Sequence, residues 1–459
     1  MRSIKVRFIQ FELRLLWQNR LFKWLMLGYV LAVLLAIIWG QMSLQREYQQ
    51  RTISEANYQT ELAEYRDDAP LDPYAAGYLG YYQFHPVWQT PSAWSALIHG
   101  ERSEAATHTR VRLLGLQGQL SNTATGNIAA MPIGKLDLSF IWIYLMPLLI
   151  AALSLNLLAE EKASGRWSLL ASQVANSGML LTKKMLIAAG LLAVVNLLIL
   201  LAAVVMTDID FDSIWLQVAA VLLAYQLCWF LITGWIISLQ RTAIFNSLLF
   251  ISLWIVFAFV LPGLAYLYQT QQQQPAEHVS MIFDQREFMH DSWDRDQQAD
   301  FDVYLQDYPQ WQTTEPTLQK PFDWRWYYAM QHMSDVIVAE AVAQFRESRV
   351  HSHQIGNQVA WLSPVMRLQY SMNRFADTDM LASQTFLDQI GDYHQQLRDY
   401  FFDFYFFDKS FTEADFANIP VFEYQPVMQS YTLKSLINLV LIGLFFVGLI
   451  MLQTRRNRG

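Results

Sequence analysis

Apolar residues of this 459-residue chain are gathered into six long blocks, and polar residues fill the stretches between them. A helix needs about 20 mostly apolar residues to cross the hydrocarbon core of a bilayer. The pattern therefore predicts six membrane-spanning helices, at residues 24–41, 138–158, 185–206, 214–237, 243–268 and 433–452. The predicted fold class is an all-α polytopic membrane protein.

Two long polar insertions separate the predicted spans, residues 42–137 after the first span and residues 269–432 after the fifth. Residues 43–68 lack Pro and Gly, so the first span is predicted to continue outward as a helix. Residues 107–120 alternate like a strand. Both insertions are predicted to be mainly helical, the larger with helices at 277–308, 323–352 and 366–407. The smaller one is expected to pack on a neighbour.

The first 23 residues predict a helix that lies in the membrane interface before the first span. Basic side chains flank an apolar stripe at helical spacing, which consists of Ile4, Phe8, Phe11 and Leu15. An amphipathic helix of this kind rests its apolar face on the acyl chains and keeps its charges among the headgroups.

Charge gives the predicted orientation. Charged residues make up 16% of the chain, against about 25% in soluble proteins. The stretches 1–23, 159–184, 238–242 and 453–459 together carry +11, and the polar stretches on the opposite side carry −19. Because cytoplasmic flanks retain Lys and Arg, both termini are predicted to be cytoplasmic and both insertions extracytoplasmic. The −14 charge of the second insertion disfavours nucleic acid as a partner.

The segment between the second and third spans, residues 159–184, carries the most specific pattern. An acidic pair is followed by a glycine and a short amphipathic run, formed by Glu160, Glu161, Gly165, Arg166, Trp167, Leu169 and Leu170, with Ser172 and Lys183 or Lys184 beyond. From periodicity alone, an ordinary charged loop explains it equally well. The order Glu-x-x-x-Gly, Leu-Leu-x-Ser and a later Lys resembles the coupling helix of ABC-2-type export permeases. Where such permeases often have a proline after the serine, this chain has Val174 and Ala175.

A second resemblance lies in the larger insertion. Its residues 361–364, 373–379 and 386–400 are similar to the branch of ABC-2 permeases related to the nitrous-oxide-reductase maturation permease. The resemblance implies a permease subunit of an exporter in the bacterial inner membrane, with periplasmic insertions and a basic cytoplasmic tail at 453–459. Its implied partners are cytoplasmic ATPase subunits, which bind ATP and Mg, a second permease copy or paralogue, lipid and an extracytoplasmic protein.

No catalytic or cofactor site is predicted in the chain itself. The phosphate-binding sequence Gly-x-x-x-x-Gly-Lys-Ser/Thr is absent, so ATP hydrolysis is expected from a separate subunit. Potential metal ligands occur at His351/His353 and in the cluster of Met330, His332 and Met333, but two neighbouring ligands do not define a metal site. The aromatic runs at 324–328 and 401–407 suggest either core packing or partner contacts, with the core preferred for the second run.

Two alternative functions stay open at this point. A non-transporting scaffold or mechanotransmission subunit would relay ATPase motion to an extracytoplasmic partner. An ion-coupled secondary transporter is less favoured, because such proteins usually carry ionisable residues at mid-membrane. The central parts of the six predicted spans contain no Asp, Glu, Lys or Arg.

Overall fold

The computed structural model describes residues 2–68, 73–103, 106–123, 137–163, 165, 177–272, 275–313, 315–426 and 432–456. These residues are mainly helical, as predicted. The described sheet has two short antiparallel strands, β1 (His85–Trp88) and β2 (His108–Val111), with Val87 opposite Thr109. The fold is therefore built almost entirely from packed helices.

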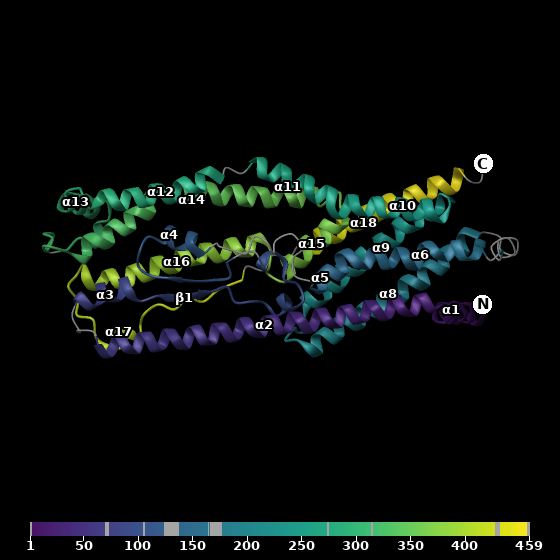
Figure 1. Cartoon of the computed structure of the whole chain (residues 1–459), viewed down its shortest axis with the longest axis horizontal. Helices are drawn as coiled ribbons and strands as arrows, with labels where there is room; N and C mark the ends of the chain where they lie inside the picture. Colours follow the sequence, from purple (N-terminus) through teal and green to yellow (C-terminus); the bar gives the residue numbers. More distant parts are fainter. Residues whose placement is uncertain are drawn as a thin grey trace.

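Within the described residues, six helices are long and apolar enough to cross a membrane, in agreement with the sequence prediction. They are formed by α2 (Arg20–Asp68), by α5 (Leu138–Phe140) with η4 (Ile141–Leu145) and α6 (Met146–Ala163), by α8 (Ser177–Met206), by α9 (Ser213–Ser238), by α10 (Ala243–Ile255) with η5 (Val256–Val260) and α11 (Leu261–Gln272), and by α18 (Thr432–Arg456). The N-terminal helix α1 (Arg2–Gln18) precedes them. Both termini lie at the same end of the elongated molecule (Figure 1).

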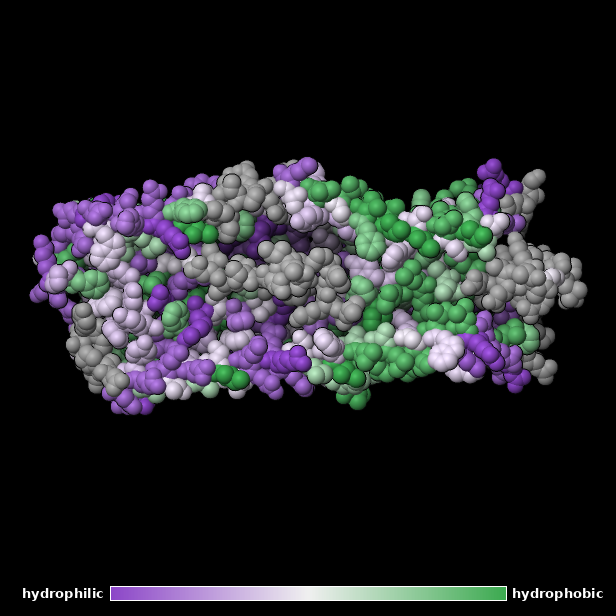
Figure 2. Space-filling view, in the orientation of Figure 1, coloured by the Kyte–Doolittle hydropathy of each residue, from purple (hydrophilic) through white to green (hydrophobic). Residues whose placement is uncertain are grey.

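On the face drawn in Figure 2, a band of apolar surface covers the part of the molecule that these six helices form. Figure 2 shows this band between a narrow polar end, where the termini lie, and a long hydrophilic half. Many large apolar side chains in the band are exposed, such as Trp24, Leu35 and Phe445. Soluble monomers rarely expose a patch of this extent, so the band identifies a surface that contacts lipid or another protein.

The six apolar helices are buried to different degrees. In the second and fourth, 72% and 61% of the apolar window lies inside the chain, whereas in the fifth the share is 17%. Helix α9 packs against α18, α6, α8 and α15 and forms the centre of the bundle. The fifth helix is consequently the one that offers most of its surface to the surroundings.

The hydrophilic half has one core, to which both insertions contribute. The first insertion supplies α3 (Pro73–Tyr82), η1 (Ala93–Ala96), η2 (Gly100–Ser103), α4 (Leu116–Thr123) and the two strands. The second supplies α12 (Pro275–Ser292), α13 (Gln297–Asp307), η6 (Pro309–Trp311), α14 (Trp324–Val359), α15 (Pro364–Phe375), α16 (Met380–Tyr405) and α17 (Glu413–Phe416). Leu79 and Val87 of the first share a buried cluster with Phe301 and Phe402 of the second. The smaller insertion thus packs on the larger, as expected.

Three local predictions were wrong. The helix predicted at 277–308 is two helices, α12 and α13, because Asp296 caps the second by accepting from Gln298 N and Ala299 N. The strand predicted at 107–120 is limited to residues 108–111, and residues 116–123 form helix α4, where Asp335 accepts hydrogen bonds from Leu116 N at 2.8 Å and Gln117 N at 3.3 Å. The helix predicted at 366–407 is broken, because Asp377 has a positive φ of 54° and Asp379 caps a new helix by accepting from Ala382 N.

The two aromatic runs lie mainly in the core of this half. Trp326, Tyr328, Phe401, Phe402 and Phe406 are each at most 2% exposed. Phe407 is 42% exposed and is the large apolar side chain that these two runs present most openly. Core packing therefore explains most of the two runs, whereas a role of the remaining residues in partner contacts stays a prediction.

Candidate functional site

The predicted coupling segment begins on the last turn of α6. Glu160 and Glu161 lie in this helix, which ends at Ala163. Gly165 follows with φ of +70°, a conformation that L side chains rarely adopt. Among the described residues, no atom would lie within 4 Å of a Cβ placed at this position. The positive φ of the turn, and not the close approach of another segment, therefore accounts for the glycine. The predicted residues Arg166, Trp167, Leu169, Leu170 and Ser172 lie outside the described residues.

The far end of this segment is joined to the N-terminal helix by an ion pair. Lys184 Nζ of α8 lies 3.3 Å from Glu12 Oε1 of α1, and both side chains are less than a tenth exposed. Lys183, its neighbour, is exposed. The structure therefore separates the two lysines that the sequence could not distinguish, and links α1 to the start of the third span.

A buried hydrogen-bonded network joins three of the apolar helices. Tyr29 Oη of α2 donates to Asn196 Oδ1 of α8 at 2.7 Å, and Asn196 Nδ2 donates to Gln226 Oε1 of α9 at 3.0 Å. Gln226 Nε2 in turn donates to the Ala189 carbonyl. Asn196 and Gln226 are polar residues inside predicted spans, whereas nothing in the sequence marks Tyr29. The network serves helix packing, the commonest role of such residues.

Two π-helical turns, η4 and η5, lie in the second and fifth apolar helices. In a π turn, a backbone N–H donates to the carbonyl five residues earlier, instead of four as in an α-helix. Such turns are frequent at functional sites. Tyr225 Oη donates to the Ile143 carbonyl at 2.6 Å, and Ser363 Oγ donates to the Phe257 carbonyl at 2.8 Å. The second bond ties the fifth apolar helix directly to the N-terminal cap of α15.

Helix α15 connects the hydrophilic half to the apolar bundle. Val365, Leu368 and Met372 on this helix belong to the same buried cluster as the apolar helices. Ser371 Oγ donates to Ser435 Oγ of α18 at 2.7 Å. The C-terminal end of α15 meets the first insertion, where Ser92 Oγ donates to the carbonyl of the capping residue Ala376 at 2.5 Å. The helix is thus packed between both halves of the molecule.

Arg367 is the central polar residue of this junction and is fully buried. Its guanidinium donates to Asn357 Oδ1 at 2.8 Å, to the Asn357 carbonyl at 2.9 Å and to Asn438 Oδ1 at 3.2 Å. It also lies over the Trp361 ring, 5.4 Å from the centroid. One side chain therefore holds together α14, α15 and α18. A lone Arg in an amphipathic helix gave no sequence signal for this role.

The turn after α15 carries a second buried charge cluster. Arg374 Nη1 lies 2.9 Å from Asp379 Oδ1, and Tyr424 Oη donates to Asp377 Oδ2 at 2.7 Å. Burial raises the pKa of Asp377 above its usual value, although the bond from Tyr424 and the charge of Arg374 oppose this. These contacts fix the turn between α15 and α16.

The potential metal ligands make other contacts. His332 Nδ1 lies 2.9 Å from Tyr304 Oη, and His353 packs against the Tyr370 ring. Within the described residues there is no group of three or more His, Cys, Asp or Glu side chains that could hold a metal ion. The described contacts of His332 and His353 are packing and hydrogen bonds.

Comparison with known proteins gives one match. A family model described as a domain of unknown function, DUF3526, matches residues 268–425. The matched region is the polar insertion between the fifth and sixth apolar helices, together with the end of α11. No curated protein sequence and no solved structure matches the chain.

Proposed function

We propose that this chain is the membrane-spanning subunit of an ABC-2-type transporter, most consistent with an exporter driven by a separate ATPase subunit. The observation that carries the proposal is the arrangement around residues 159–184. A helix with an acidic end leads to Gly165, and in the following apolar helix α8 Lys184 pairs with Glu12 of the N-terminal helix α1. An ATPase docked on this segment would move α6, α8 and α1 together.

The orientation proposed from charge is supported by the shape of the molecule. The +11 stretches would lie at the end that carries both termini, and the acidic insertions would form the long hydrophilic half beyond the apolar band (Figures 1 and 2). In the proposed arrangement the former faces the cytoplasm, and the latter lies outside the inner membrane of a bacterium.

A second permease copy or paralogue is part of the proposal. The fifth and sixth apolar helices expose large side chains along much of their length, among them Ile244, Leu248, Phe259, Leu441 and Phe445. Lipid and a partner permease would share this surface. An extracytoplasmic protein remains the proposed partner of the hydrophilic half.

The relay function is the second candidate, and the junction at α15 favours it. Arg367 and the Ser363 bond to the Phe257 carbonyl make a close connection between the spans and the hydrophilic half. In a relay, this connection would pass ATPase motion to an extracytoplasmic partner without moving cargo through the spans. Transport by reconstituted vesicles distinguishes the two functions.

Purification of the full chain with its co-expressed ATPase tests the proposal. We expect Glu161→Lys to reduce ATPase association, because it reverses the charge at the docking end of α6. We expect Gly165→Leu to uncouple hydrolysis, because Leu disfavours a positive φ, whereas Gly165→Asn should retain coupling since Asn tolerates that conformation. Failure to recover any ATP-binding subunit with the parent chain would refute both the exporter and the relay.

Cysteine labelling tests the orientation. In a Cys228→Ala background, Gln50→Cys and Asp302→Cys should react with an impermeant thiol reagent on intact cells, and Lys183→Cys should react only after lysis. All three positions are exposed. Labelling of position 183 alone on intact cells would reverse the proposed topology.

A further inference from the structure

The end of the hydrophilic half that lies farthest from the two termini carries a cluster of aromatic side chains. Helix α3, the start of α14 and the turn after α12 meet at this end (Figure 1). Each ring has its centroid within 6.0 Å of another ring of the cluster. We call this cluster the aromatic tip, and its members are Tyr78, Tyr81, Tyr82, Trp293, Trp324 and Tyr327.

A glycine brings α3 directly against α14 at the tip. A Cβ at Gly77 would lie 2.5 Å from the Trp324 ring, so glycine is needed for this close approach. Tyr328 Oη of α14 then reaches the Gly77 carbonyl and donates to it at 2.6 Å. Tyr78 and Tyr82, about one helical turn apart, lie on a different face of α3. The glycine contact therefore fixes α3 with these two tyrosines turned toward solvent.

The rings of the tip lie at steep angles to one another. The Tyr81 and Tyr82 rings are 4.7 Å apart at 69°, and the Trp324 and Tyr327 rings are 6.0 Å apart at 79°. Tyr81 and Tyr327 meet at 51°. Rings in this arrangement form walls instead of one flat platform. A compact group such as a guanidinium or an ammonium fits between them better than a sugar ring, which stacks on a flat aromatic surface.

Three rings of the tip are widely open to the surroundings. Tyr78, Tyr82 and Trp293 are 42%, 45% and 48% exposed. Single exposed rings are common, but a contiguous cluster of Tyr and Trp is typical of a contact surface. Tyr65, whose ring lies 6.2 Å from that of Tyr78, is about 36 Å along α2 from residue 41, where the predicted first span ends. Lipid around the apolar band is therefore too distant to cover the tip.

Exposed carboxylates surround the tip. They are Glu64 and Asp67 at the end of α2, and Asp291 and Asp294 on either side of Trp293. The side chain of Asp67 is 74% exposed, and the second insertion as a whole carries −14. This acidic field attracts a cationic partner, and it repels both an anionic polymer and the tip of a second copy.

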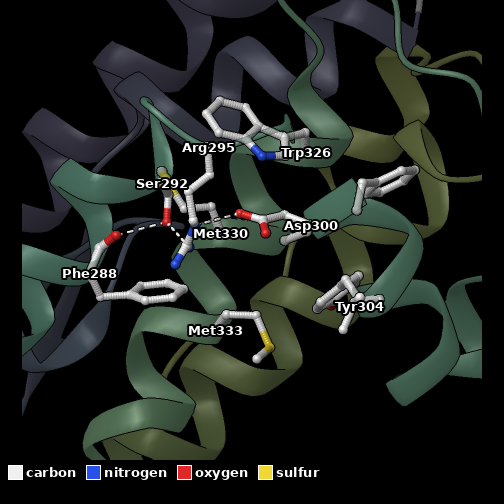
Figure 3. Close-up of a pocket in the computed structure, with 11 residues that line it drawn as sticks. Phe288, Ser292, Arg295, Asp300, Tyr304, Trp326, Met330 and Met333 are labelled. Carbon is white, nitrogen blue, oxygen red and sulfur yellow. Dashed lines mark hydrogen bonds and ion pairs between the residues drawn. The ribbon is translucent and has the colours of Figure 1, made fainter. Parts of the chain in front are cut away.

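Basic side chains close to the tip are mostly paired with carboxylates. Arg295 Nε donates to Asp300 Oδ2 at 2.9 Å (Figure 3). Arg66 Nε lies 3.5 Å from Asp67 Oδ1. Lys320, which precedes α14, is exposed and opposes the acidic field only in part. The charge that a partner meets at the tip is consequently negative.

The chain itself shows how a cation is held at these rings. The Arg112 guanidinium lies 5.3 Å from the Tyr81 ring centroid and 4.8 Å from the Phe84 ring centroid. A cation within about 6 Å of a ring centroid is attracted by the electron-rich face of the ring. Guanidinium also stacks on such faces, which an ammonium group does less well. The tip therefore favours Arg over Lys.

We propose that the aromatic tip binds a basic segment of an extracytoplasmic protein. Arg side chains of the segment lie against the rings of Tyr78, Tyr82 and Trp293, and the surrounding carboxylates attract it. The inference rests on the proposed function, which places the hydrophilic half outside the cytoplasm, and it gives the chemistry of the extracytoplasmic partner proposed there.

The test uses the purified full chain in detergent and an end-labelled peptide of four Arg-Gly-Ser repeats. Fluorescence anisotropy measures binding, and we expect it to saturate and to weaken as salt is added. A peptide with Lys in place of Arg should bind about threefold more weakly. A peptide with Glu in place of Arg, and the uncharged oligosaccharide chitohexaose, should not compete.

Variants of the full chain locate the site. Tyr78→Leu combined with Tyr82→Leu keeps apolar bulk and removes two rings, and should weaken binding about tenfold. Asp291→Asn combined with Asp294→Asn should weaken binding and reduce its salt dependence. Phe283→Leu is the matched control, because Phe283 is a 62% exposed ring outside the tip, and this variant should bind like the parent. Melting temperatures close to that of the parent will show that each variant is folded.

Four outcomes would overturn the proposal. The first is no saturable binding at millimolar peptide. The second is binding that the double tyrosine variant leaves unchanged, which would mean general attraction between charges. The third is displacement of the peptide by chitohexaose, which would assign the tip to a saccharide. The fourth is a smaller oligomer for the double tyrosine variant than for the parent, which would assign the tip to a second copy of the chain.

Recovery of the co-expressed ATPase is measured in a separate purification. Loss of peptide binding with the ATPase recovered refutes this inference alone. Peptide binding by a chain that recovers no ATPase refutes the proposed transport function, and it supports the tip as a site for a basic segment.

Discussion

Lys184 and Glu12 form a buried ion pair, with Nζ and Oε1 separated by 3.3 Å. Removing one partner of such a pair leaves a charge in a dry environment, at a cost of about 3–5 kcal/mol. We therefore expect Glu12→Gln and Lys184→Gln each to lower the apparent unfolding temperature of the detergent-solubilised chain. Lys183→Gln is the matched control and should have no effect, because Lys183 is exposed. A swapped pair, Glu12→Lys with Lys184→Glu, should recover part of the loss.

The bond from Ser363 to the π turn η5 gives a second prediction. Ser363→Ala removes the donor to the Phe257 carbonyl and the cap of α15, and should destabilise the junction by about 1–2 kcal/mol. Hydrogen exchange of α15 and η5 measures the effect, and faster exchange is expected in both. Ser348→Ala is the control, because the Ser348 hydroxyl donates within its own helix. Equal exchange in the two variants would mean that the bond to η5 has no mechanical role.

Replacing Arg367 should loosen the hydrophilic half from the spans. Arg367→Met leaves Asn357 and Asn438 oxygens buried without their donor, and we expect a loss of about 3 kcal/mol or more. The stability of Arg367→Lys should lie between that of the parent and that of Arg367→Met, because a single ammonium group cannot reproduce the planar set of guanidinium donors.

Limited proteolysis between the two halves measures this loosening. The control is Arg346→Met. Arg346 pairs with Asp388 on the surface, where such a pair contributes less than about 1 kcal/mol. If Arg367→Met resists protease as well as Arg346→Met does, the guanidinium is not the connection that we describe.

The stability of the hydrophilic half should fall in acid. Burial, with a smaller effect from His394, lowers the pKa of His85 to about 3, whereas an unfolded chain has a His pKa of about 6.5. Between these values the unfolded chain binds the additional proton, so stability decreases as the pH falls below about 6.5, by up to about 1.4 kcal/mol per pH unit.

Unfolding temperatures measured from pH 7.5 to pH 5 test this dependence. His85→Gln should give a shallower slope, because glutamine does not titrate and its amide can still hydrogen bond to Tyr58. His290→Gln is the matched control on an exposed histidine and should follow the parent. A slope unchanged by His85→Gln would assign the acid sensitivity to other groups.

Local sequence signals predicted the parts of this fold that depend on short stretches of chain. The six apolar helices follow from the lengths of the apolar blocks, and the continuation of α2 to Asp68 follows from the absence of Pro and Gly. The break between α15 and α16 was missed, although the short sequence from Asp377 to Asp379 contains the capping residue. Apolar residues recur at helical spacing on both sides of the break, so the pattern predicted one continuous helix.

Contacts between distant residues could not be predicted from one sequence. Tyr328 Oη donates to the Gly77 carbonyl at 2.6 Å, across the two insertions, and this bond helps to build their common core. The same reason applies to Tyr29 and Arg367, whose partners lie on other helices. The coupling segment was predicted from its residue types, and its role stays a prediction. The structure adds the left-handed turn at Gly165 and the contact of Lys184 with α1.

Helix α2 has 49 residues, so at about 1.5 Å per residue it is a single rod of about 74 Å. It starts beside the N-terminal helix and ends near α17, where Arg66 lies 3.9 Å from Glu413 (Figure 1). Along the way Arg51, Tyr58 and Glu61 hydrogen bond to Thr90, His85 and Arg110 in the remainder of the first insertion. A tilt of about 5° within the bilayer would swing the far end by roughly 6 Å. The first span is thus also a lever arm, and a distance probe at its tip would report rearrangements that are too small to detect in the bilayer itself.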